Sequence, residues 1–267
     1  MLAAVLAAGD GEGFHAPGIE EFYPGALLFE GTIFEINRIM LVRFVMVALL
    51  ALFFILALRR AKLVPRGLQN VAEYFLDFVR LHIAEEILGK GAARRFLPIL
   101  TTFFFMITAL NLAGVIPLLN IAGTSLIGTP LVLAIVAWIV FNYAGIKAQG
   151  FGPYMKSNLL PSGVPLYMAP IIVPVEFVST FILRPFALTV RLLANMMAGH
   201  LILVLFFSAT NFMFVEAGSA LLAPVGVLTL GAGFAFTLFE ILVAVLQAYI
   251  FTLLAAVYID LASHAEH

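Results

Sequence analysis

Five side chains that can hold a charge or pass on a proton lie within two long apolar stretches in the last third of the chain. They are Glu176, Arg184, Arg191, His200 and Glu240. A charge at the middle of a membrane helix costs about 2.5–3.5 kcal/mol on insertion scales, and such residues usually mark ion or proton paths. A carboxylate and a histidine can carry a proton, whereas an arginine holds a fixed positive charge. The chemistry these residue types predict is therefore proton transfer.

Arg191 and Asn195 are four residues apart, so on a helix they share one face. Small residues follow them, including Ala198 and Gly199, and small residues allow close helix–helix approach in membranes. Arg184 has two interpretations. It lies either on the same proton path as Arg191 or at the membrane interface, where its charged end reaches water. Arg191 is flanked by apolar or small residues on both sides, which favours a functional role.

His200 follows Arg191 by nine residues, about half a turn away around a helix, so it faces a different environment. An unperturbed histidine titrates near pH ~6.5, which suits a proton relay, although a hydrogen-bonded packing role is the alternative. Glu240 and Gln247 are seven residues apart and lie on nearly one face. Gln247 can hydrogen-bond an arginine without cancelling its charge, or it can simply join two helices.

Other kinds of chemistry have no signal in the sequence. We find neither a G-x-x-x-x-G-K-[ST] phosphate loop nor an H-E-x-x-H zinc motif. The absence of cysteine excludes disulfides and thiolate metal sites, and the net charge of −1 does not suggest a nucleic-acid partner. We therefore predict no metal and no cofactor.

The composition indicates that lipid surrounds much of the chain. Of 267 residues, 63% are hydrophobic and only 11% are charged, with a mean hydropathy of +1.12. Soluble domains are about 45–50% apolar and about 25% charged, so too few charges are present here to cover a water-facing surface. Several stretches reach the roughly 20 apolar residues that a spanning helix needs. The predicted fold is an all-α integral membrane protein.

The elements that would position the candidate residues follow from the apolar stretches. Residues 1–35 form an acidic external arm, and residues 36–267 form a single transmembrane domain. The charged stretch 66–95 has helical apolar spacing and predicts an interfacial amphipathic helix. Neither of the last two apolar segments contains a loop-like polar stretch, which favours a long tilted C-terminal helical hairpin. The five predicted crossings are about 36–58, 96–118, 127–146, 164–210 and 219–259.

The distribution of Lys and Arg predicts an orientation. The connector 59–95 holds eight of the 14 Lys and Arg residues, and the loop predicted at 147–165 holds two more. Because short loops rich in Lys and Arg stay in the cytoplasm, both should be cytoplasmic. A multi-pass protein of the cell (plasma) membrane follows, with the N-terminus outside and the C-terminus in the cytoplasm.

Two runs in the last third resemble subunit a of the F-type ATP synthase: Arg191-Leu-Leu-Ala-Asn195-Met-Met-Ala-Gly199-His200 and Leu246-Gln247-Ala248-Tyr249-Ile250-Phe251. The family pattern is Arg-Leu-x-x-Asn-x-x-Ala-Gly, followed by Gln-Ala-(Tyr/Phe)-Ile-Phe in the same order and spacing. The resemblance extends to the amphipathic segment and to residues 111–117, so it covers nearly the whole chain beyond the N-terminal arm.

The resemblance implies a mechanism. The hairpin wraps a ring of c subunits, protons reach and leave the ring through two offset half-channels, and Arg191 prevents a direct leak between them. Asn195 and Gln247 then flank Arg191, while His200 and Glu240 line the half-channel that opens to the outside. Glu176 lies one residue out of register with a carboxylate that many members have. This coupling of proton flow to ring rotation and ATP synthesis requires as partners the c-ring, b-type peripheral stalk subunits, the rest of the synthase and the lipid bilayer. The chain itself need not be catalytic.

Two rival functions are open to the sequence. A secondary transporter for a small solute would show internal repeats with interrupted helices, and no such repeat is visible. A structural membrane anchor would use the amphipathic helix but would leave Arg191, His200 and Glu240 without a role. An Arg191→Lys change separates the possibilities, because lysine can lose its proton when desolvated and a proton gate should not tolerate that.

Overall fold

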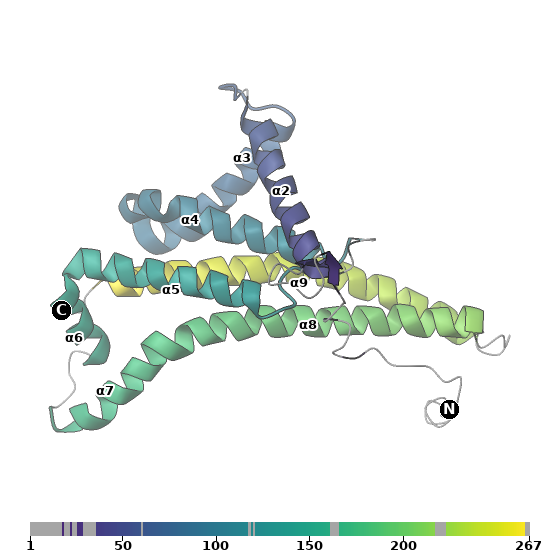
Figure 1. Ribbon diagram of the computed structural model, residues 1–267. Coiled ribbons are helices and arrows are strands. Elements are labelled where there is room, and N and C mark those ends of the chain that lie inside the picture. Colours follow the sequence, from purple (N-terminus) through teal and green to yellow (C-terminus); the bar gives the residue numbers. More distant parts are fainter. Residues whose placement is uncertain are drawn as a thin grey trace.

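Helices make up most of the described chain (Figure 1). The computed structural model describes residues 18, 22, 26–28, 36–59, 61–116, 119, 121–160, 166–216 and 223–264. Within this described part, five helical runs are long and apolar enough to cross a membrane, namely Arg38–Leu58, Leu68–Leu112, Gly128–Gln149, Ala169–Val215 and Ala223–Ser263. The predicted all-α membrane architecture is confirmed.

The first long helix, α2 (Arg38–Leu58), begins at a side-chain cap. Oδ1 of Asn37 accepts a hydrogen bond from the backbone N–H of Met40 at 2.9 Å. Immediately before it, the short strand β2 (Ile36–Asn37) pairs antiparallel with β1 (Ala26–Leu28). This pairing ties part of the N-terminal arm to the start of α2.

The run α3 (Leu68–Val79), η2 (Arg80–Glu85) and α4 (Glu86–Leu112) is almost continuous, with η2 forming a π-helical turn. The sequence analysis expected the change from interfacial helix to crossing near residue 95. The helical run is interrupted at Gly89, whose φ of 70° is a left-handed conformation that glycine adopts readily. The chain changes direction there, and α4 then continues unbroken into the apolar stretch.

The next crossing, α5 (Gly128–Gln149), ends at Gly150, where a φ of 86° turns the chain. A short helix, α6 (Phe151–Leu159), follows directly. The sequence analysis interpreted residues 147–165 as a loop, and for the span of α6 this is wrong.

Tyr154 explains why a stretch rich in glycine and proline is helical here. Its side chain is fully buried, and its hydroxyl donates to Oδ1 of Asn142 on α5 at 3.0 Å. The ring lies directly on Gly145, where a Cβ would overlap it. Burial raises the pKa of the Tyr154 phenol. Packing of α6 against α5 thus overrides local propensity.

The two C-terminal segments form a long hairpin. A 3-10 turn, η3 (Leu166–Met168), leads into α7 (Ala169–Phe177), the π-helical turn η4 (Val178–Leu183) and α8 (Arg184–Asn211), and η5 (Phe212–Glu216) extends α8. Figure 1 shows this run bending away at α7, while α8 lies along α9 (Ala223–Ser263). No loop divides either segment within the described residues, as predicted.

Contacts along the hairpin show that α8 and α9 are antiparallel, because the partner number on α9 rises as the number on α8 falls. The contacts that mark this register are Thr210 with Thr229, Gly199 with Glu240, and Arg191 with Gln247. Small residues at the contact, such as Gly226 and Gly233, let the two backbones approach closely.

The main core lies where α4, α5, α8 and α9 meet. Leu100, Phe141 and Leu192 are almost completely buried there, and the rings of Phe103 and Phe251 pack edge to face with centroids 5.5 Å apart. This core holds α8 and α9 against the other helices and leaves the outer face of α8 uncovered.

Candidate functional site

Arg191 lies on the uncovered face of α8. Its side chain is exposed, as are those of Asn195 and of the small residues Ala187, Ala194 and Ala198 around it. Among the described residues no carboxylate lies within ion-pair distance of Arg191. A guanidinium on a membrane helix cannot face hydrocarbon at low cost, so this face requires a protein partner or a water-filled path.

Gln247 joins the two long helices just behind Arg191. It is only 3% exposed, and its Nε2 donates to the backbone oxygen of Arg191 at 3.3 Å. The sequence analysis expected the Gln247 amide to hydrogen-bond the Arg191 guanidinium. In the structure the amide instead contacts the Arg191 backbone. This bond fixes where along α9 the helix α8 lies, and it leaves the guanidinium directed outward.

His200 and Glu240 lie on the covered side of the same helix pair. Each is only 5% exposed. The carboxylate of Glu240 occupies the space beside Gly199, where a Cβ would overlap both of its oxygens. Glycine at position 199 therefore makes room for Glu240 next to the backbone that carries His200. The structure thus places Glu240 of α9 beside the residue that precedes His200 on α8.

The ring of His200 has an aromatic neighbour from the N-terminal arm. Phe22 packs against it edge to face, with ring centroids 5.1 Å apart and an interplanar angle of 62°. Phe22 is fully buried.

Two buried polar residues continue from Glu240 towards α4. The Nδ2 of Asn111 donates to the backbone oxygen of Ala244 at 3.4 Å, one turn of α9 beyond Glu240. The hydroxyl of Thr124 donates to Oδ1 of Asn111, and both residues are at most 1% exposed. Sequence reasoning did not propose Asn111 or Thr124 as site residues, although an asparagine in an apolar run was a usable signal for the first.

Arginines of α2 secure the chain segment that carries Thr124. Nε of Arg43 donates to the backbone oxygen of Gly123 at 2.7 Å, and Nη2 of Arg38 donates to that of Leu119 at 3.2 Å. The structure shows that both arginines hydrogen-bond the connection between α4 and α5.

Glu176 is not part of this group. It lies half-buried on α7, roughly 36 Å along the helical run from His200 at 1.5 Å per residue. Glu176 therefore cannot exchange a proton directly with His200 or Glu240.

Arg184 also has surroundings of its own. Its guanidinium lies over the ring of Tyr258 on α9, 5.2 Å from the centroid, which is a cation–π contact. Arg184 is thus partly covered and in contact with an aromatic ring, whereas Arg191 is exposed on α8.

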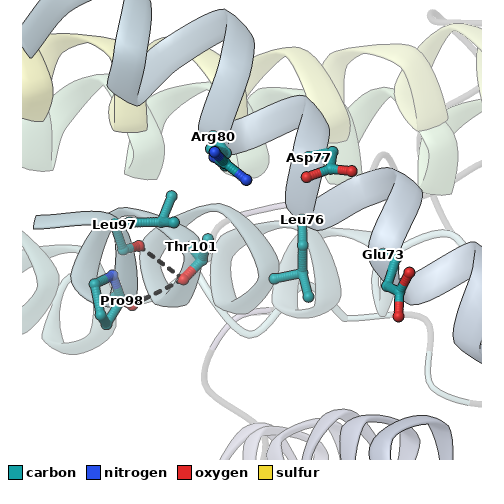
Figure 2. A pocket seen from close by; sticks show the side chains of 7 residues that line it. All are labelled: Glu73, Leu76, Asp77, Arg80, Leu97, Pro98 and Thr101. Carbon is teal, nitrogen blue, oxygen red and sulfur yellow. Dashed lines mark hydrogen bonds between the residues drawn. The ribbon is translucent and has the colours of Figure 1, made fainter. Parts of the chain in front are cut away.

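A cavity of about 440 Å³ lies between α3 and α4, away from the candidate residues (Figure 2). Two of its polar side chains already have partners within the protein. Nε of Arg80 pairs with Glu85 at 2.7 Å, and the hydroxyl of Thr101 donates to backbone oxygens of α4. The residues that line it are Glu73, Leu76, Asp77, Arg80, Leu97, Pro98 and Thr101. None of them belongs to the predicted site.

The fold and the site define a class of protein. In the part of the chain that the structure describes, no three His, Cys, Asp or Glu residues are grouped to hold a metal. What remains is a multi-pass membrane protein with one outward arginine and a buried histidine–carboxylate pair on one helical hairpin.

Comparison with known proteins places the chain within this class. The family model described as "ATP synthase A chain" matches residues 40–260. Proteins named "ATP synthase subunit a" are similar over almost the full length: that of Rhodococcus erythropolis is 56% identical over 95% of this chain and 92% of its own length. The protein of Pseudarthrobacter chlorophenolicus is 39% identical over 100% of this chain and 99% of its own length. That of Parafrankia sp. is 41% identical over 96% of this chain and 86% of its own length. The chain belongs to the ATP synthase A chain family.

Proposed function

We propose that this chain conducts protons as the stator subunit of the membrane sector of an F-type ATP synthase, with Arg191 between two half-channels that open to opposite sides of the membrane. The observation that carries the proposal is the division of one helix hairpin into two sides. Arg191 and Asn195 are exposed on α8, whereas His200 on α8 and Glu240 on α9 are buried.

The outward face of α8 suits the ring of c subunits. Alanines at positions 187, 194 and 198 surround Arg191, so a partner helix can approach close to the guanidinium. Charge complementarity calls for an acidic partner, because the described residues offer Arg191 no carboxylate of their own. A carboxylate on each ring subunit meets that requirement.

Arg191 acts by its charge. At about 4 Å and an effective dielectric constant of about 20, an arginine attracts a carboxylate by roughly 4 kcal/mol, enough to favour release of its proton. The guanidinium itself stays protonated, so it cannot carry the proton onward. A ring carboxylate that reaches Arg191 therefore loses its proton to one half-channel and takes up the next proton from the other.

The buried pair forms the inner part of the half-channel from the outside. His200 and Glu240 have side chains of the types that can carry a proton, and both are buried. Asn111 and Thr124 add polar groups beside α9, one turn beyond Glu240. We assign Glu176 to the other, cytoplasmic part of the path, since α7 follows the connection that carries Lys147 and Lys156.

The orientation belongs to the same proposal. The N-terminus and residues 1–35 lie outside, the domain of residues 36–267 spans the plasma membrane, and the C-terminus is cytoplasmic, because residues 59–95 hold eight of the 14 Lys and Arg residues. The chain has no cysteine, so single introduced cysteines and a membrane-impermeant thiol reagent test it directly. Labelling of an introduced cysteine at Lys62 from the outside would contradict this orientation.

The test of function is ATP-driven proton pumping by inverted membrane vesicles that hold the assembled complex. Arg191→Ala and Arg191→Lys should abolish pumping at unchanged complex content. Arg184→Ala is the matched control, because it removes the same side chain from the same helix, and it should retain most of the pumping. Pumping by Arg191→Ala at the level of Arg184→Ala would overturn the proposal.

A further inference from the structure

Phe22, a described residue of the N-terminal arm, contacts His200 of the proposed proton path. Its ring contacts the His200 ring at 5.1 Å between centroids, and its side chain is fully buried. A phenylalanine that is 0% exposed has a fixed position, because it gives up its contact with water or lipid only for close packing.

The β1–β2 pairing explains how the arm reaches this position. β1 begins four residues after Phe22 and is hydrogen-bonded to β2, which runs directly into α2. Four residues span at most about 14 Å, so the pairing restricts where Phe22 can lie. The pairing thus holds β1 at the start of α2, and Phe22 contacts α8 through His200.

We propose that Phe22 covers one side of His200 in the outer half-channel and is a positioning residue for the imidazole, an inference that rests on the proposed function. Gly199 and Glu240 lie on the α9 side of this part of α8, and Phe22 supplies an apolar contact from the arm. Phe22 also lies outside residues 40–260, the part that matches the family model.

Two physical effects follow from the contact. The benzene ring excludes lipid and water from one side of His200, so a proton that arrives at the imidazole is directed to the polar side that holds Glu240. An edge-to-face pair also favours one orientation of the imidazole over others, by a factor of about two to ten. The first effect requires only an apolar group of this size, whereas the second requires an aromatic ring.

A cross-link tests the position of the arm without reference to activity. Because the chain lacks cysteine, Phe22→Cys combined with His200→Cys can be treated with a short bifunctional methanethiosulfonate in the assembled complex. The control pair is Phe22→Cys with Ile202→Cys, since Ile202 is exposed on another side of α8. We expect a link to position 200 and not to position 202. Failure to link position 200, or equal linking of both, overturns the inference.

Pumping and passive proton conduction test the role of Phe22. Phe22→Ala should lower both by about two- to tenfold, the range that the lost ring contact allows, and Phe22→Leu, which keeps an apolar group without the ring, should restore only part of the loss. Phe44→Ala is the control, since Phe44 is 63% exposed on α2 and touches none of the proposed path. If Phe22→Ala conducts as well as Phe44→Ala, the positioning role is wrong.

The two proposals can fail separately. If Arg191→Ala loses pumping while Phe22→Ala keeps it, the proposed function stands and the inference about Phe22 is overturned. If Arg191→Ala pumps normally, the proposed function is overturned and the positioning role with it, while the cross-link still reports whether the arm covers His200.

Discussion

Substitution of Gly199 by alanine adds one methyl group at the place where the Glu240 carboxylate lies. The added Cβ would overlap both carboxylate oxygens and the carboxyl carbon, so the Glu240 side chain must rotate away. The displaced atoms are the end of a flexible side chain, and a strained rotamer costs about 0.5–1.5 kcal/mol. Folded proteins have roughly 5–15 kcal/mol of stability, so the variant should still assemble.

The effect on proton movement should be larger than the effect on stability. A displacement of about 1 Å at a reacting group can cost up to roughly a hundredfold in rate. We therefore expect Gly199→Ala to lower ATP-driven pumping by about tenfold or more, measured in inverted vesicles and normalised to the amount of assembled complex.

Two further variants make this prediction specific. Gly231→Ala is the matched control on α9, because nothing lies within 4 Å of a Cβ there, and it should pump normally. Glu240→Asp shortens the side chain by one methylene, so Gly199→Ala with Glu240→Asp should pump better than Gly199→Ala alone. Normal pumping by Gly199→Ala would refute the view that Gly199 makes room for a working carboxylate.

Three other predictions concern hydrogen bonds. Gln247→Leu removes the donor to the Arg191 backbone and should lower the stability of the complex by about 0.5–1.5 kcal/mol in thermal denaturation. Pumping should be reduced but present. Abolished pumping would mean that the amide takes a direct part in proton transfer. Arg43→Met removes a charged donor to Gly123 and should lower the free energy of unfolding by about 1.5–3 kcal/mol, seen as a lower midpoint temperature in thermal denaturation. An unchanged midpoint would show that this bond does not contribute to stability. Tyr154→Phe removes a buried hydroxyl bond between α5 and α6 and should cost about 1 kcal/mol by the same assay, and a stabilised variant would contradict that account.

Much of the site could be predicted because charge is rare in this chain. Arg191, His200 and Glu240 stand out within apolar stretches, and helix geometry alone predicts that Arg191 and His200 face different sides. The structure agrees, since Arg191 is exposed and His200 is buried. The long hairpin was equally predictable, because no polar stretch divides either segment.

Contacts between distant segments could not be read from the sequence. Asn111 joins the site because α4 packs against α9, and Thr124 joins it because the connection between α4 and α5 folds back onto the end of α4. The helix α6 depends on Tyr154 packing against a glycine of α5, a tertiary contact in a stretch whose composition favours a loop. Phe22 reaches His200 from the N-terminal arm, far away in sequence, and no periodicity records that approach.

The proposed function depends most on Arg191 as the barrier between two half-channels. The direct measurement is passive proton leak through the assembled complex in vesicles with an imposed membrane potential, where each proton that crosses 100 mV gains about 2.3 kcal/mol. With ATP-driven pumping recorded in the same vesicles, Arg191→Ala should lose pumping and leak more protons than the wild-type complex. Unchanged pumping together with an unchanged leak would contradict the account.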